Sequence, residues 1–183
     1  MKDIFDIKEI EKTERLENEY DLQKASMLER KLRLMADENP ELKTVRKKLR
    51  SLIREYEGRN WADFNNIIDF QVDESDKAEE TIQKEEAFIR KRKAAIREKL
   101  KEFDMSQQEL GVLLGHPKSY MSELINGVSQ FTLKDLVIIH RVFGVSLKTL
   151  IPTYLQSETK EKVRESINKL NKPKLKLRKT EMI

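Results

Sequence analysis

Apolar and polar positions alternate most regularly in residues 105–152, where short amphipathic segments are separated by glycines. Ser106 stands three residues before Glu109, which is the spacing of a capping box: each side chain accepts a hydrogen bond from the other residue's backbone N–H. Gly115 suits the left-handed conformation that ends many helices. The pattern therefore predicts a helix that begins after Ser106 and runs to Leu114.

Residues that begin and end helices recur along the rest of this stretch. Pro117 can occupy the first position of the next helix, where its missing N–H costs nothing, and Gly127 ends that helix. Thr132 begins a third helix with a second capping box, and Gly144 ends it. A last short helix precedes Pro152, so we predict four short helices joined by tight turns.

The second of these helices has two different faces when successive residues are placed about 100° apart. Its apolar face holds Tyr120, Met121, Leu124 and Ile125. Its polar face holds Lys118, Ser119, Ser122, Glu123 and Asn126. Serine, asparagine and lysine side chains can contact base edges and phosphates in a major groove. The face alone leaves two interpretations open, a DNA recognition helix and an ordinary amphipathic surface helix.

Several short motifs in this stretch resemble the Cro and lambda-repressor (Xre) helix-turn-helix family. They are Met105-Ser-Gln-Gln-Glu-Leu-Gly111, Leu114-Gly115, Met121-Ser122-Glu123-Leu124, Asn126-Gly127, and Phe143-Gly-Val-Ser-Leu147 with Leu150. The resemblance runs through all the turns. It implies a compact five-helix domain whose first capped helix crosses the DNA backbone and whose second lies in the major groove.

The resemblance also implies roles for individual side chains. Gln107 is expected to contact phosphate, and Asn126 to bind phosphate near the end of the recognition helix. The residues expected to face the bases are Lys118, Ser119 and Glu123, and Ser122 on the same polar face is a further candidate DNA contact. Two positions depart from the family pattern: Gly111 replaces the usual alanine at the helix crossing, and Ile125 stands where many members have glutamate.

A closer resemblance is to the HigA branch, whose members are antitoxins with a helical N-terminal domain and a C-terminal helix-turn-helix. It is carried by Pro117-Lys-Ser-Tyr-Met-Ser122, Gly127 and Thr132-Leu133, with a weaker likeness at Glu38-Asn39-Pro40 and in residues 61–65. The resemblance implies that the N-terminal helices bind and neutralise a small ribonuclease toxin of the HigB (RelE-like) type.

Composition supports an all-α chain and argues against catalysis. Apolar residues make up 38% of the 183 residues and charged residues another 38%, and nearly all of the four prolines and five glycines stand at predicted helix ends. No cysteine means no disulfide and no thiolate ligand or nucleophile. His116, expected to cap the recognition helix, and His140, inside the third helix, have no ligand-spaced neighbours. We expect no enzyme, no metal and no cofactor.

Two further features concern location and charge. No apolar run is long enough to cross a membrane and the N-terminus lacks a signal-peptide core, so we expect a cytoplasmic protein. Residues 90–101 carry seven basic residues and one acidic residue, and residues 158–183 have a net charge of +5 within a chain total of +4. Positive charge therefore flanks the helix-turn-helix, which suits phosphate attraction; a solvated helix face explains residues 90–101 nearly as well.

The spacing of apolar residues in the N-terminal half predicts further helices. Residues 8–36 form one expected helix, which either packs in a bundle or binds a partner, and residues 41–57 form a second with a clean 3.6-residue stripe, ended by Gly58. Residues 61–70 predict a short apolar helix that contributes to the bundle core rather than to a docking site. The acidic residues 73–80 mark the expected boundary between two modules.

These elements give four expected regions. They are a helical partner-binding or dimerisation domain (1–75), an acidic helical linker (76–90), the DNA-binding domain (91–155), and a basic tail (156–183). A helix is expected to resume near Thr81, and its last part, residues 91–103, to open the DNA-binding domain. In the tail, a short helix precedes Lys172–Lys179, which alternate basic and apolar residues. This end is either disordered, a source of non-specific DNA affinity, or a strand for a partner's sheet edge.

Together these observations predict an antitoxin and autorepressor that binds a palindromic operator as a homodimer, with recognition helices roughly 34 Å apart on the duplex. The alternative is a stand-alone Xre-type regulator whose N-terminal helices sense a signal or build the dimer. A weaker third hypothesis is a helical protein that uses the helix-turn-helix only as a fold.

Overall fold

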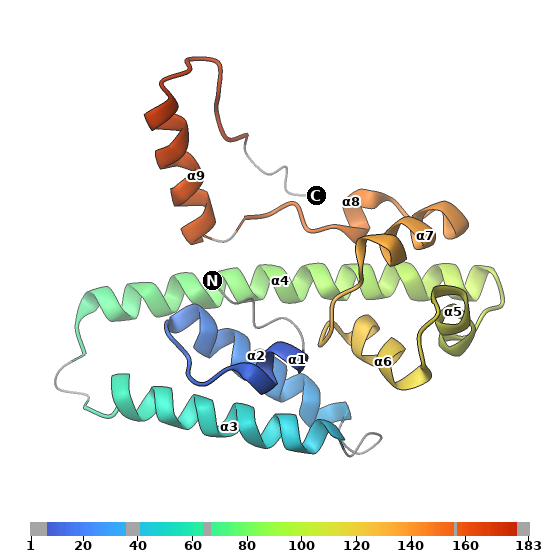
Figure 1. The fold of residues 1–183 in the computed structure, drawn as a ribbon, viewed down its shortest axis with the longest axis horizontal. Coiled ribbons are helices and arrows are strands. Elements are labelled where there is room, and N and C mark those ends of the chain that lie inside the picture. The colour runs from blue at the N-terminus through green and yellow to red at the C-terminus, as the bar shows by residue number, and fades with distance from the viewer. Residues whose placement is uncertain (1–6, 36–40, 64–66, 156, 179–183) are drawn as a thin grey trace. The chain divides into compact units, whose positions relative to one another are not determined.

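A computed structural model describes residues 7–35, 41–63, 67–155 and 157–178. Every regular element within those ranges is a helix, so the predicted all-α class is confirmed (Figure 1). The chain divides into two compact units, Met1–Leu150 and Ile151–Ile183.

The N-terminal part of the first unit is a helical bundle of α1 (Ile7–Lys12), α2 (Glu19–Met35), α3 (Glu41–Asn60) and the first half of α4 (Asp69–Glu102). Figure 1 shows α2 lying between α3 and α4. The predicted stripe of α3 forms one wall of the bundle core, and its buried members are Leu42, Val45, Leu49, Leu52 and Tyr56. The 3.6-residue spacing thus identified the buried face of α3 correctly.

A charged pair lies inside this bundle. Lys24 of α2 and Glu85 of α4 are each 1% exposed and form a salt bridge, and Tyr20 Oη donates a 2.7 Å hydrogen bond to the same carboxylate. Removing one partner would leave an uncompensated buried charge, which costs several kcal/mol. The pair therefore favours one register of α2 against α4.

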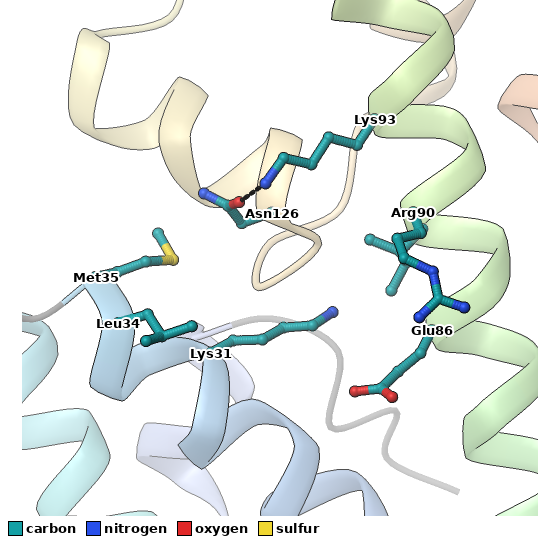
Figure 2. A pocket seen from close by; sticks show the side chains of 8 residues that line it. Lys31, Leu34, Met35, Glu86, Arg90, Lys93 and Asn126 are labelled. Atoms are coloured by element: carbon teal, nitrogen blue, oxygen red, sulfur yellow. Dashed lines mark hydrogen bonds between the residues drawn. The ribbon is translucent and has the colours of Figure 1, made fainter.

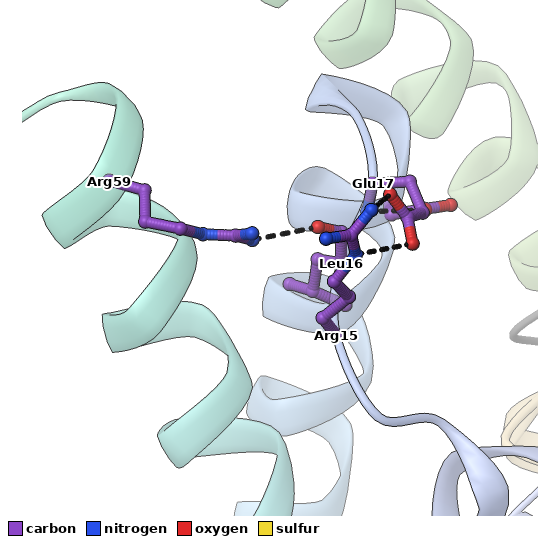
Figure 3. Close-up of polar contacts among 5 residues, drawn as sticks. Arg15, Leu16, Glu17 and Arg59 are labelled. Atoms are coloured by element: carbon purple, nitrogen blue, oxygen red, sulfur yellow. Dashed lines mark hydrogen bonds and ion pairs between the residues drawn. The ribbon is translucent and has the colours of Figure 1, made fainter.

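The expected single helix over residues 8–36 is wrong, because α1 ends at Lys12 and α2 begins at Glu19. Asn18 Oδ1 accepts a 2.9 Å hydrogen bond from the Asp21 backbone N–H, which is the geometry of a helix N-cap. Leu16, in the connection, is buried. Figure 3 shows how Arg59 holds this connection by donating a 3.0 Å hydrogen bond to the Leu16 carbonyl.

Three other expectations about the N-terminal half are corrected. Helix α3 continues through Gly58 to Asn60. A glycine inside a helix costs only about 1 kcal/mol, and the last turn is held by hydrogen bonds from Arg59 to the Leu16 carbonyl and from Asn60 to the Tyr56 carbonyl. The apolar helix predicted for residues 61–70 is not formed among its described residues, and α4 begins only at Asp69. Residues 64–66 and 36–40 lie outside the described residues.

The acidic residues 73–80 do not interrupt the backbone, because they form the first part of the 34-residue helix α4. Ion pairs between α4 side chains three or four positions apart, such as Lys84 with Glu80 at 2.6 Å, support this exposed stretch. The first half of α4 buries Ala78 and Ile82, and its second half buries Ile96 and Leu100. Division of the chain into the four regions above stays a prediction.

The second half of α4 packs with the helix-turn-helix elements, which are α5 (Gln107–Leu114), α6 (Lys118–Asn126), α7 (Leu133–Phe143) and α8 (Leu147–Leu150). These five helices match the predicted domain. In the second unit, α9 (Ser157–Leu170) corresponds to the expected tail helix. Residues 171–178 form neither helix nor strand, and the three interpretations of this end stay untested.

Candidate nucleic-acid interface

Helix α5 begins with the predicted capping box. The Glu109 backbone N–H donates to Ser106 Oγ at 3.2 Å, and the Ser106 backbone N–H donates to Glu109 Oε2 at 2.7 Å. Hydrogen bonds from the Ser106 backbone and hydroxyl lower the pKa of Glu109. Gly115 ends the helix with φ of 78°, as predicted. Local sequence thus fixes both ends of the first helix of the motif.

Gly111 lies where α5 crosses α6. A Cβ atom at this position would come within 2.8 Å of both the His116 carbonyl oxygen and Met121 Cγ. The His116 backbone N–H also donates to the Gly111 carbonyl at 2.8 Å. The helices approach so closely that even the alanine usual in the family does not fit without a shift. This contact explains the departure from the family pattern.

The start of α6 differs in detail from the prediction. Pro117 is the N-cap residue, with ψ of 158°, rather than the first helical residue, and α6 has no side-chain cap. His116 therefore does not cap α6. Its Nε2 lies 3.1 Å from Asp135 Oδ1 in α7, and its ring lies edge-on to Tyr120 with centroids 5.1 Å apart. His116 instead connects the turn to α7.

Asp135 is also the partner of Thr132 in the second predicted capping box, which is present. Burial by itself raises the pKa of Asp135, but hydrogen bonds with Thr132 and His116 outweigh that effect and hold the pKa below its ordinary value. The carboxylate is 2% exposed. One buried charge thereby links the α5–α6 turn to the start of α7.

Helix α6 presents the predicted polar face. Met121, Leu124 and Ile125 are buried on the opposite side, and Gly127 ends the helix with φ of 68°. Lys118 and Ser119 are exposed, and Gln107 at the start of α5 is partly exposed. These three side chains do not belong to the buried face, so they can contact a partner.

Glu123 and Asn126 have partners within the protein. The Ser129 hydroxyl donates to Glu123 Oε2 at 3.0 Å. Asn126 Nδ2 donates to the Ser122 carbonyl at 2.8 Å, and Asn126 Oδ1 accepts from Lys93 Nζ at 2.6 Å. DNA contacts by these two side chains would compete with those bonds. Their DNA-binding roles stay predictions.

Two connections join α4 to the last residue of α6 and to the segment after α6, and the sequence predicted neither of them. Lys93 reaches Asn126, and the Arg92 guanidinium lies 5.2 Å from the ring centroids of both Phe88 and Phe131. Val128, just after α6, is buried in the same core cluster as the N-terminal helices. The basic run in residues 90–101 was the only sequence signal, and it does not specify which lysine faces inward.

The described residues also bear on metal sites and on membrane spans. No group of three or more His, Asp or Glu side chains among the described residues could hold a metal ion. Over the same ranges, no helix combines the length and apolar character that a membrane span requires.

Comparison with known proteins finds one family. Residues 96–150 match the helix-turn-helix family of Xre/Cro type. No curated protein and no solved structure matches the chain significantly. The matched segment includes the end of α4 and all of α5–α8. The family match, which covers the α5–α6 helix pair, supports a DNA-binding transcription regulator as the class of this protein.

Proposed function

We propose that this protein binds a palindromic operator as a homodimer and represses its own transcription. The observation that carries the proposal is the polar side of α6, with Lys118 and Ser119 exposed at its N-terminal end and Met121, Leu124 and Ile125 buried on the opposite side. Lysine and serine at the N-terminal end of a recognition helix can bond base edges. Gln107, partly exposed at the start of α5, would contact phosphate.

Exposed apolar side chains support the homodimer. Large hydrophobic residues with high exposure in the helix-turn-helix part are Val112, Leu113, Leu133, Val137, Val142 and Leu147. Val112 and Leu133 are 78% and 71% exposed. Contiguous patches of exposed apolar side chains are typical of protein interfaces, and these residues are the candidates for a dimer contact. A closed dimer would place two recognition helices one turn of DNA apart, roughly 34 Å.

We further propose that the N-terminal helices bind and neutralise a small basic ribonuclease toxin of the HigB (RelE-like) type, which makes the protein an antitoxin acting in the cytoplasm without enzymatic activity. Support comes from the resemblance to HigA and from exposed apolar residues around the start of α4, Ile68 (62%) and Phe70 (67%). The alternative is a stand-alone Xre-type regulator. No observation favours that alternative over the antitoxin.

Operator binding is tested with the full-length chain and DNA from upstream of its own gene. Fluorescence anisotropy should show tight binding that exceeds binding to a scrambled fragment and weakens as salt rises. Footprinting should reveal two half-sites one helical turn apart. Equal affinity for the scrambled fragment would contradict sequence-specific binding, and one protected half-site with a monomeric complex would contradict the dimer.

The antitoxin function is tested by expressing a small basic protein encoded next to this gene. Growth arrest that is relieved by co-expression of the full chain, with a stable complex of the two on size-exclusion chromatography, is the expected result. A Phe70→Ser variant should lose the complex and keep operator binding. If the chain binds its operator but no adjacent gene encodes a protein that arrests growth, the stand-alone regulator is the correct function.

A further inference from the structure

A pocket of about 260 Å³ lies between the end of α2, the middle of α4 and the end of α6. Figure 2 shows side chains from all three helices around it. The lining residues are Lys31, Leu34, Met35, Glu86, Ile89, Arg90, Lys93 and Asn126. The proposed operator contacts involve only one of these residues, so most of the pocket is unexplained by DNA binding.

Lys31 is the unusual member of the lining. Its side chain extends from α2 toward α4 (Figure 2), and Nζ is buried with no hydrogen-bond partner among the residues that the structure describes. A buried ammonium group without a partner is costly. Burial, with repulsion from Lys24, lowers its pKa to about 8. An acceptor oxygen in the pocket would remove this cost, which makes Lys31 a strong anchor for an anion.

The charges of the other lining residues also favour an anion as the ligand. Arg90 and Lys93 add two more cations from α4, against the single carboxylate of Glu86. Glu86 also lies 3.7 Å from Arg30, so its charge is shared with a cation outside the lining. The formal surplus of two positive charges matches a phosphate monoester, which carries between one and a half and two negative charges.

The apolar lining limits the size and chemistry of the ligand. Leu34, Met35 and Ile89 surround the basic side chains. The volume is below the range of pockets for drug-sized molecules, roughly 300–1,000 Å³. We propose that this pocket binds a small phosphate monoester, with its phosphate on Lys31, Arg90 and Lys93 and its carbon skeleton against the apolar residues.

Binding there has a consequence for α6, and this step rests on the proposed operator binding. A phosphate bound to Lys93 Nζ shares the donors of the amino group with Asn126 Oδ1 and weakens the hydrogen bond between those two residues. Asn126 is the last residue of α6 and also bonds the Ser122 carbonyl. The ligand therefore alters the end of the recognition helix and adds negative charge beside it. Operator affinity falls when the pocket is filled, and by linkage DNA weakens ligand binding equally.

The proposal is tested by calorimetry on the full-length chain without DNA, using inorganic phosphate and glycerol phosphate at constant ionic strength. Wild type should bind, and glycerol phosphate should bind more tightly. Lys31→Met and Arg90→Gln should each weaken affinity by roughly tenfold to a hundredfold, the range for one lost hydrogen bond to a charged group. Lys77→Met, which removes an exposed lysine far along α4 in sequence, should bind like wild type.

Two outcomes overturn the pocket: no binding to wild type, or equal binding by wild type and Lys31→Met. If these side chains bind only the phosphates of DNA, wild type will bind neither inorganic phosphate nor glycerol phosphate. Anisotropy with operator DNA then measures the coupling, and glycerol phosphate should weaken DNA binding in wild type but not in Lys31→Met. Calorimetry without DNA keeps a failure of the pocket distinct from a failure of operator binding.

Discussion

Lys93 Nζ donates a 2.6 Å hydrogen bond to Asn126 Oδ1, and so joins the long helix α4 to the last residue of α6. Next to this bond, a Cβ on Gly127 would lie 2.7 Å from Ile89 Cγ2. Val128 then enters the core shared with the N-terminal helices. The end of α6 is therefore packed against the N-terminal half of the same unit.

Lys93→Met tests this connection. Loss of the hydrogen bond leaves Asn126 Oδ1 without its charged donor, so the free energy of unfolding should fall by roughly 1–2 kcal/mol in urea unfolding. Lys91→Met is the matched control because Lys91 is an exposed lysine on the same helix. Equal stability of the two variants would show that the Lys93–Asn126 bond contributes nothing.

Gly111→Ala should destabilise the protein. The new Cβ would meet the His116 carbonyl oxygen at 2.8 Å, and overpacking of this kind costs roughly 1–3 kcal/mol. Gly58→Ala is the control, since no atom lies within 4 Å of its added Cβ. That variant should be more stable than wild type by roughly 0.5–1 kcal/mol. Thermal unfolding of both variants measures the contrast, and a stabilised Gly111→Ala would contradict the close crossing.

Lys31→Met should stabilise the protein at neutral pH. The pKa of Lys31 is lowered from 10.5 to about 8, by burial first and then by repulsion from Lys24 and Arg92, against the attraction of Glu86 and Glu85. The unfolded chain therefore binds the proton more tightly, and the penalty of the charged lysine is fully present below pH 8.

Replacement by methionine removes that penalty, so the free energy of unfolding should rise by roughly 1–3 kcal/mol at neutral pH. The stability difference between Lys31→Met and wild type should shrink as pH rises from 8 toward 10.5, because Lys31 of wild type then loses its proton in both the folded and the unfolded state. Urea unfolding across this range measures it. Lys77→Met supplies the exposed control, and an advantage that does not change with pH would contradict the assignment to Lys31.

Asp135→Asn should lower stability at neutral pH by roughly 1 kcal/mol, since the carboxylate accepts the hydrogen bond of the Thr132 backbone N–H in the capping box and faces His116. The folded pKa lies below the ordinary 3.8, so this contribution is present above that value and is lost as pH falls through the folded pKa. The difference from wild type in urea unfolding should therefore narrow in acid. Asp73→Asn, at an exposed position of α4, should show no such pattern.

The helix-turn-helix was predictable because its signals are local. The capping boxes at Ser106 and Thr132 and the left-handed glycines specify helix ends from neighbouring residues alone. The same local rules apply at the start of α2, where Asn18 Oδ1 accepts a hydrogen bond from the Asp21 backbone N–H. The prediction of one helix over residues 8–36 did not take this N-cap into account.

Tertiary contacts account for what sequence did not reveal. Lys93 and Asn126 are 33 positions apart, and nothing near either residue indicates the other. The acidic residues at the start of α4 suggested a boundary, yet α4 continues through them, because an exposed helix tolerates many charges when they pair along its surface. The pocket around Lys31 likewise exists only because three helices far apart in sequence converge.

The most direct test of the account is the operator affinity of a Lys118→Ala, Ser119→Ala variant beside wild type, measured by anisotropy on the operator and on a scrambled fragment. Lys77→Ala serves as the control. The account predicts that the variant loses its preference for the operator, by roughly 1–3 kcal/mol per lost base contact, while keeping salt-sensitive binding to both fragments. Operator binding as tight and selective as that of wild type would contradict the assignment of α6 as the recognition helix.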